Sequence, residues 1–295
     1  MVMGWDGAFT KIPQMRVGRQ YRAIETTRLA PNPRSRPARV VHSQRPCDNH
    51  PPNKEVDVNE TAKFKEVRIE LPEPLEGCDS LSAVIGFPEW WPTGARIAVV
   101  IAHGAGDLDD PLVTRLHEDL AQDRFLTLRF NFPFAEAGKK PKNPDPAVLD
   151  KAFRAALSLL SRDKSSAPSH LFLGGLGLGA LSAARLATTR IHADGLFFLG
   201  FPLHPKAAPD KPDIEALYQL TSSMLFLQGS KDPRCDLDVL RRSLSRVGAP
   251  TILRIFKGAD GSLLRSGLSE AERAGTYRAA ARTVGDWIDG ILDDA

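Results

Sequence analysis

The sequence predicts an α/β domain with a mostly parallel sheet and helices on both faces. Three observations carry this prediction. Short apolar segments alternate with amphipathic segments from residue 96 onward, and parallel strands need such crossover helices between them. Residues 96–102 are apolar almost without interruption, which is typical of a strand covered on both faces. A third observation is a cluster of glycines at 174–179 between an apolar run and a segment of small residues, which indicates a tight strand–turn–helix junction.

The elements follow in order along the chain. Alternating polarity at 67–71 and 81–87 predicts two strands, of which the first is an edge strand. Leucines at spacing four predict a helix over 110–122. Further strands are expected at 96–102, 125–130, 171–174, 195–201, 223–227 and 251–256. Further helices are expected at 147–160, from the glycine cluster to about 188, at 237–247 and at 270–292. The Pro-rich stretches 131–146 and 202–213 are predicted to be loops that cap a pocket.

The charge is unevenly distributed. The formal net charge is +3, whereas residues 1–54 hold ten Lys or Arg and three acids, a balance of +7, so the remainder carries 3 − 7 = −4. A basic, Pro-rich segment of this kind cannot bury enough apolar surface to fold, so residues 1–61 are expected to form a disordered leader before one domain at 62–295. A transit peptide and a docking arm remain alternatives, so organelle targeting stays open. A nucleic-acid-binding core is not expected.

The cysteines and the hydropathy restrict the compartment. Three cysteines without a C-x-x-C pair do not form a disulfide framework or a zinc site, and they fit a reducing compartment. No apolar run has the roughly 18 residues of a membrane helix, and the start has no hydrophobic signal core. The protein is therefore expected to be cytoplasmic, without a membrane partner, a metal or a cofactor.

Several phrases carry a family resemblance. They are the turn at 102–106, the segment 128–133, the Gly175-Leu176-Gly177-Leu178-Gly179 junction, the phrase at 200–205 (Gly-Phe-Pro-Leu-His-Pro) and the phrase at 229–233 (Gly-Ser-Lys-Asp-Pro). In these phrases the sequence resembles the KANSL/TEX-type α/β-hydrolase-like family, which is related to the dienelactone hydrolases. The resemblance covers about residues 96–265 and implies an α/β-hydrolase fold.

The resemblance also implies where a Ser-His-Asp site would stand. The nucleophile of the Gly-x-Ser-x-Gly elbow maps onto Gly177, the acid onto Asp232 and the histidine onto Gly261, so this sequence keeps only the acid. Backbone N–H groups of Leu178 and of the turn His103-Gly104-Ala105 would form the oxyanion site. Acyl transfer by this route needs a hydroxyl and an imidazole, and glycine supplies neither.

Substitute groups are few. Ser230 and Ser262 lie near the expected acid and base positions without an evident base of their own, and Cys235 begins a helix where packing is the plainer role. His103 is expected to hold the oxyanion turn by hydrogen bonds, and His204 to have a structural or lid role. Asp232 without a histidine can simply bond nearby N–H groups in its turn. His117, His170 and His192 are expected at exposed positions, and no histidine has a metal-ligand spacing.

Three functions remain open at this stage. The first is a pseudoenzyme or binding module on a hydrolase fold, with a small acyl or carbonyl ligand in the pocket or a protein partner. The second is a weak or unusual serine-type hydrolase with a replacement nucleophile. The third is dinucleotide binding, because Gly175-x-Gly177-x-x-Ala180 fits Gly-x-Gly-x-x-Ala, although at least two strands precede it and the next strand ends without an acid.

Overall fold

The structure is a computed structural model, and it describes residues 62–89, 96–161, 167–206, 208 and 211–293. These residues all belong to one compact unit, Val56–Ala295. The predicted leader, residues 1–61, lies outside the described residues.

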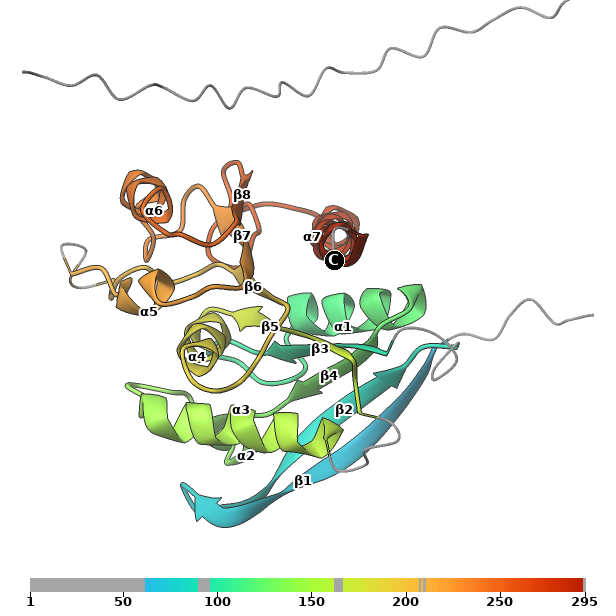
Figure 1. The fold of residues 1–295 in the computed structure, drawn as a ribbon. Helices are drawn as coiled ribbons and strands as arrows, with labels where there is room; N and C mark the ends of the chain where they lie inside the picture. The colour runs from blue at the N-terminus through green and yellow to red at the C-terminus, as the bar shows by residue number, and fades with distance from the viewer. Residues whose placement is uncertain (1–61, 90–95, 162–166, 207, 209–210, 294–295) are drawn as a thin grey trace, which may run out of the picture. The chain divides into compact units, whose positions relative to one another are not determined.

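The described part of the chain forms one eight-stranded sheet in the order β1-β2-β4-β3-β5-β6-β7-β8 (Figure 1). The strands are β1 (Lys63–Leu75), β2 (Cys78–Phe87), β3 (Ile97–Ala102), β4 (Leu126–Phe130), β5 (His170–Leu176), β6 (Gly195–Leu199), β7 (Ser223–Gly229) and β8 (Thr251–Phe256). β1 and β2 are antiparallel, and β2 pairs antiparallel with β4. All pairs from β4 to β8 are parallel, as the sequence predicted.

The helices cover both faces of the sheet (Figure 1). They are α1 (Pro111–Asp123), α2 (Pro133–Glu136), α3 (Pro146–Leu160), α4 (Leu178–Ala187), α5 (Glu215–Tyr218), α6 (Leu237–Leu244) and α7 (Glu270–Asp293). The two shortest, α2 and α5, lie in or beside stretches predicted as loops, since a single helical turn leaves no periodic pattern in a sequence. The other five were predicted to within a few residues.

Aspartates define where three helices begin. The carboxylates of Asp110, Asp145 and Asp236 accept hydrogen bonds from the first N–H groups of α1, α3 and α6. These N–H groups have no acceptor inside the helix, so an aspartate at this position stabilises it by roughly 1 kcal/mol. At α7, Ser269 and Glu272 exchange hydrogen bonds in a capping box.

The core lies in two layers, one on each side of the sheet. In β3, Val100 and Ala102 pack into the layer that includes α3 and α4, while Val99 and Ile101 pack into the layer that includes α1 and α7. Alternate side chains of a strand point to opposite faces, so a strand buried on both faces must be apolar at every position. This explains why the parallel strands read as continuous apolar runs.

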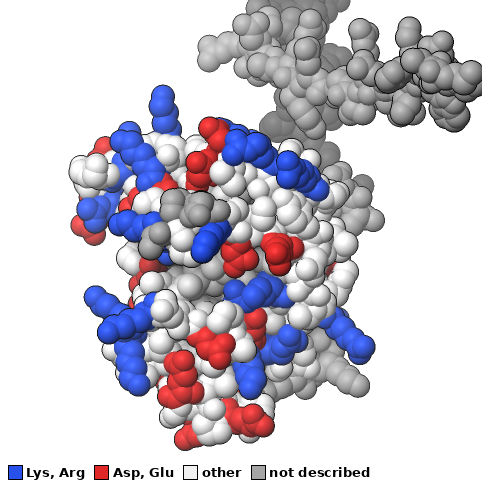
Figure 2. Space-filling model, turned by 90° about the vertical axis from the view of Figure 1, so that its left-hand side faces the viewer, with Lys and Arg blue, Asp and Glu red and all other residues white. Residues whose placement is uncertain are grey.

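The surface carries charges of both signs, and the described residues contain no membrane-spanning helix and no metal-binding cluster. Figure 2 shows Lys and Arg interspersed with Asp and Glu over the face in view. Among the described residues no helix is long and apolar enough to cross a membrane. Within the same residues no group of three or more His, Cys, Asp or Glu side chains could hold a metal ion.

Candidate functional site

The junction of β5 and α4 forms a sharp elbow with Gly177 at its tip. Gly177 has φ 55° and ψ −108°, and it is the N-cap residue of α4. Its N–H donates to the carbonyl of Leu199 at 3.0 Å, and its carbonyl accepts from Leu181 N–H at 3.2 Å. A positive φ costs free energy for any residue with a Cβ, so glycine relieves strain that this turn imposes.

The glycines on either side of Gly177 are required for space. A Cβ at Gly175 or at Gly179 would lie 2.4 Å from the carbonyl oxygen of Ala102. A Cβ at Gly177 would instead meet its nearest neighbours, Arg234 Nη2 and Gly104 Cα, at 3.7 and 3.8 Å. Packing against β3 therefore explains two of the three glycines in the Gly-x-Gly-x-Gly phrase, and backbone conformation explains the third.

The predicted oxyanion turn lies beside this elbow. Leu178 is the first residue of α4, so its N–H has no acceptor within the helix. His103 is fully buried: its Nε2 accepts from Phe132 N–H at 2.9 Å, and its Nδ1 lies 3.0 Å from the carbonyl of Gly104, to which it donates. Burial lowers the pKa of His103 to about 4, against the opposing effects of Gly104 and Asp107. The imidazole is neutral with both nitrogens bonded, so its hydrogen bonds hold the turn and leave no nitrogen for a substrate.

Asp232 lies in the turn after β7 and is buried. Its Oδ2 accepts from Gln228 Nε2 at 2.9 Å, and its Oδ1 accepts from Arg234 N–H at 2.9 Å. The bond from Arg234 N–H is the local turn bond that the sequence analysis expected of an Asp232 without a histidine partner. The carboxylate is fixed from both sides, as a positioned acid or a structural turn residue would be.

Gly261 lies directly against this carboxylate. A Cβ at Gly261 would lie 2.7 Å from Asp232 Oδ2 and 3.1 Å from its Cγ. The acid position and the expected histidine position are thus neighbours in space, as the resemblance implied. The carboxylate, however, occupies the place that the first side-chain atom at 261 would need.

The loop around Gly261 is fixed in this arrangement. Asp260 Oδ1 accepts from the N–H and the hydroxyl of Ser262 at 2.9 and 2.7 Å. Leu263 is buried with φ 64°, and a Cβ at Gly200 would lie only 1.8 Å from the carbonyl of Gly261. The loop around Gly261 is thus held by its own hydrogen bonds and packs closely against the backbone of Gly200.

Sequence analysis missed Arg234. Its guanidinium lies within van der Waals distance of the Cβ position at Gly177, and it makes no hydrogen bond or ion pair with another residue that the structure describes. Arg234 is half-buried and follows the acid by two positions. The available signal was the basic side chain in the Asp-Pro-Arg turn, which brings a cation to the same edge of the sheet as the elbow.

The other candidate groups are already engaged. The hydroxyl of Ser230 accepts from Gly258 N–H at 2.8 Å, and that of Ser262 donates to Asp260. Burial, with smaller contributions from Asp232 and Asp236, raises the pKa of the Cys235 thiol to about 12. His204 is buried, with its Nδ1 3.1 Å from the carbonyl of Pro205. Among the described residues the only base bonded to one of these hydroxyls is Asp260, which accepts from Ser262.

The expectation that His117 is exposed was wrong. His117 lies on the inner face of α1, fully buried, with its ring centroid 5.3 Å from that of Phe64 in β1. Burial, with a smaller effect of Arg129, lowers its pKa to about 3, and neither ring nitrogen has a hydrogen-bond partner. The cover is supplied by the antiparallel strand β1, which the local pattern of α1 could not indicate. His170 is half-buried, with its Nδ1 3.4 Å from Asp194 Oδ1. His192 is exposed.

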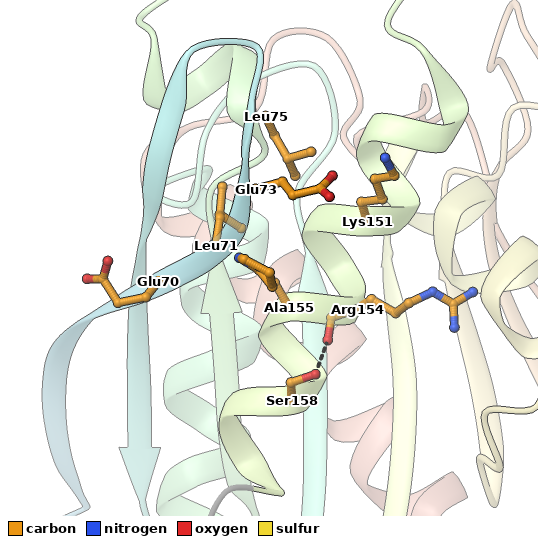
Figure 3. Close-up of a pocket in the computed structure, with 9 residues that line it drawn as sticks. Glu70, Leu71, Glu73, Leu75, Lys151, Arg154, Ala155 and Ser158 are labelled. Atoms are coloured by element: carbon orange, nitrogen blue, oxygen red, sulfur yellow. Dashed lines mark hydrogen bonds between the residues drawn. The ribbon is translucent and has the colours of Figure 1, made fainter.

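A separate pocket lies between β1 and α3. It has a volume of about 310 Å³ and an apolar floor that includes Leu71, Leu75 and Ala155. Figure 3 shows Glu73 on the strand side and Lys151 on the helix side of this pocket. Its lining shares no residue with the elbow, so it is not part of the site described above.

Comparison with known proteins decides the family. The model of the alpha/beta hydrolase domain family matches residues 95–289, more than half of the chain. The chain belongs to this family. A dienelactone hydrolase from Anabaena variabilis is similar in structure, with a TM-score of 0.61, 19% identity, and coverage of 78% of this chain and 99% of that chain. An alpha-beta serine hydrolase homologue from Coxiella burnetii has a TM-score of 0.55 and 17% identity, with coverage of 73% and 96%.

A third neighbour is described as a dienelactone hydrolase-like promiscuous phosphotriesterase from metagenomic libraries, with a TM-score of 0.57 and 17% identity, and coverage of 77% and 99%. At these identities the neighbours show the shared α/β-hydrolase fold. Dienelactone hydrolases are thus among the proteins that share this fold.

Proposed function

We propose that this α/β-hydrolase-domain protein is a pseudoenzyme whose former active site binds a small acyl or carboxylate ligand without cleaving it. The observation that carries the proposal is the pair of empty positions, Gly177 and Gly261, around a retained Asp232. At Gly177 a guanidinium stands beside the place of the nucleophile, and at Gly261 the acid itself stands where an imidazole would begin.

Hydrolysis by this fold's route needs both missing groups. A hydroxyl must attack the carbonyl and an imidazole must take its proton. The nearest alternatives do not fill these roles. The Cys235 thiol is buried with a pKa of about 12, the Ser230 hydroxyl accepts from Gly258 N–H in the loop after β8, and the Ser262 hydroxyl donates to Asp260 in its own loop. An oxyanion site without a nucleophile retains a rate acceleration of at most on the order of 10³–10⁴ over the reaction in water. A weak hydrolase with a replacement nucleophile is therefore the less supported alternative.

The groups that remain at the elbow favour an anion. The free N–H of Leu178 at the start of α4 and the guanidinium of Arg234 both approach the position of Gly177. N–H donors at a helix start together with an arginine favour a carboxylate over a neutral carbonyl compound. The Arg234 cation beside position 177 would stabilise an anion bound there.

The finer family assignment is part of the same proposal. The Gly-Phe-Pro-Leu-His-Pro phrase at 200–205 and the Gly-Ser-Lys-Asp-Pro phrase at 229–233 support membership of the KANSL/TEX-type group. Dinucleotide binding has less support, because close packing against Ala102 accounts for Gly175, and the positive φ of the elbow accounts for Gly177, without a pyrophosphate.

Two measurements test the proposal with the full-length chain. Incubation with a fluorophosphonate probe and with p-nitrophenyl acetate should give no covalent labelling and no turnover above a buffer control; labelling of a defined serine or cysteine contradicts the pseudoenzyme assignment. Calorimetric titration with butyrate and benzoate should show binding that Arg234→Gln weakens at least about tenfold, the loss expected of one charge-assisted contact.

Butyramide and benzamide are the matched neutral ligands for that titration. Equal binding of the acids and the amides, or binding unaffected by Arg234→Gln, would remove the support for a carboxylate site.

A further inference from the structure

The two edges of the sheet differ in how well they are protected. The edge strand β1 carries six charged residues and two prolines among its 13 residues. β8 at the opposite edge has the sequence TILRIF, with a single charge and no proline. Charges and prolines on an edge strand prevent pairing with another chain, and β8 lacks this protection. Ile252 in β8 is among the exposed large apolar residues, at 39% exposure.

The hydrogen bonds of β8 show which of its groups are directed outward. Met224 N–H donates to the carbonyl of Pro250 at 2.8 Å, and Ser230 N–H donates to the carbonyl of Phe256 at 3.0 Å. Because the direction alternates along a strand, even-numbered residues of β8 face β7. Thr251, Leu253 and Ile255 therefore point their N–H and C=O groups away from the sheet. No described helix or strand lies beyond them (Figure 1).

We propose that β8 pairs antiparallel with β8 of a second copy of this chain, with Leu253 opposite itself on the two-fold axis, to form a continuous sheet across a homodimer. A two-fold axis perpendicular to the sheet requires one residue to lie opposite its own copy. With Leu253 at the centre, Thr251 pairs with Ile255 of the second copy and all three outward residues exchange hydrogen bonds. Centring on Ile252 or Arg254 leaves only two such residue pairs.

Charge selects the same register. Centring on Arg254 would bring two guanidinium groups directly opposite each other, which is unfavourable. Centring on Leu253 places Ile252 opposite Arg254 of the second copy, on the same face of the sheet. That face borders a groove of about 500 Å³, lined by residues that include Ile252, Trp287 and Asp286. The exposed Asp286 carboxylate lines this groove together with the chain's own Arg254, so the incoming arginine meets an acid there that offsets the charge of the resident arginine.

Sedimentation velocity of the full-length chain over roughly 1–100 μM tests the proposal, and a reversible monomer–dimer equilibrium is expected within that range. The matched variants are Ile252→Lys and Ile252→Glu, which change one exposed side chain to opposite charges. Each dimer contains two 252–254 pairs, so Ile252→Lys should weaken dimerisation by about two- to thirtyfold and Ile252→Glu should strengthen it by a similar factor. The double variant Ile252→Lys with Arg254→Glu reverses the two charges of each pair, so it should dimerise about as tightly as Ile252→Glu.

Hydrogen exchange identifies the occupant of the edge. Protection of the amides of Thr251, Leu253 and Ile255 should rise with protein concentration if a second copy covers them. Concentration-independent protection would mean that another part of the same chain pairs there, and it would overturn the proposal. The proposal would also be overturned if the protein stays monomeric throughout the concentration range. The same holds if Ile252→Lys and Ile252→Glu have equal dimer dissociation constants.

Discussion

Replacing Gly177 with serine separates the two reasons for a glycine at the elbow. The substitution places a hydroxyl where the proposed function puts the lost nucleophile, and the structure gives it room: the nearest atoms to a new Cβ are 3.7 and 3.8 Å away. The cost is then confined to the backbone, where φ is 55° and ψ is −108°. A residue with a Cβ in such a region costs roughly 1–3 kcal/mol, so Gly177→Ser should lower the free energy of unfolding by that amount.

Thermal and urea unfolding measure this loss. For a domain of this size, 1 kcal/mol corresponds to about 2–4 °C, so the melting temperature should fall by roughly 2–12 °C. Gly275→Ser is the control without backbone strain, since Gly275 lies in α7 with nothing within 4 Å of its Cβ position. Gly138→Ser is the control for a positive φ, 63°, in open space. Gly179→Ser is the control for a steric clash, because its Cβ would lie 2.4 Å from Ala102 O.

The relative stabilities of these four variants test whether Gly177→Ser is costly because of backbone strain. Stability should fall from Gly275→Ser through Gly138→Ser and Gly177→Ser to Gly179→Ser. A Gly177→Ser protein as stable as the wild type would refute the strain argument. A loss as large as that of Gly179→Ser would mean that the site is too small for a side chain. Esterase activity should stay at background in Gly177→Ser, since position 261 carries no imidazole and both ring nitrogens of His103 are already hydrogen-bonded.

Three further predictions concern the buried groups. The folded-state pKa values of His103 and His117, about 4 and about 3, lie below the usual 6.5, so the unfolded chain binds more protons as the pH falls. The free energy of unfolding, measured by urea titration, should therefore fall by about 1.4 kcal/mol per pH unit for each histidine between pH 6.5 and 4. His117→Leu should roughly halve that slope. It should also stabilise the fold by about 1–3 kcal/mol at pH 7, because it removes a buried ring without hydrogen bonds. An unchanged slope would contradict the lowered pKa of His117. Iodoacetamide at pH 8 should alkylate Cys235 much more slowly in the folded protein than in urea, as followed by peptide mass spectrometry, whereas equal rates would contradict a thiol pKa of about 12. Gly261→His should destabilise the fold, because its Cβ would displace the Asp232 carboxylate. The double variant Gly177→Ser with Gly261→His should show more esterase activity than either single variant only if that carboxylate moves aside. A Gly261→His protein as stable as the wild type would show that the loop around Gly261 adapts.

The parallel strands and the long helices followed directly from the sequence. Strands such as β3 are buried on both faces, so they must be apolar at every position, and this pattern needs no knowledge of their neighbours. The elbow was equally visible, because the close packing of Gly175 and Gly179 against β3 leaves no alternative to glycine. The absence of a hydroxyl at 177 and of an imidazole at 261 is a property of the sequence itself.

The environment of each remaining group depended on segments far apart in the chain. The burial of His117 comes from Phe64 in β1, and its neighbours in α1 do not reveal this contact. The approach of Arg234 to Gly177, and of the Asp232 carboxylate to Gly261, arises because the parallel strands bring their carboxyl ends to one edge of the sheet. The sequence by itself determined that positions 177 and 261 carry no side chain. Only the tertiary structure decided which side chains stand in their place, because packing between distant segments sets those distances.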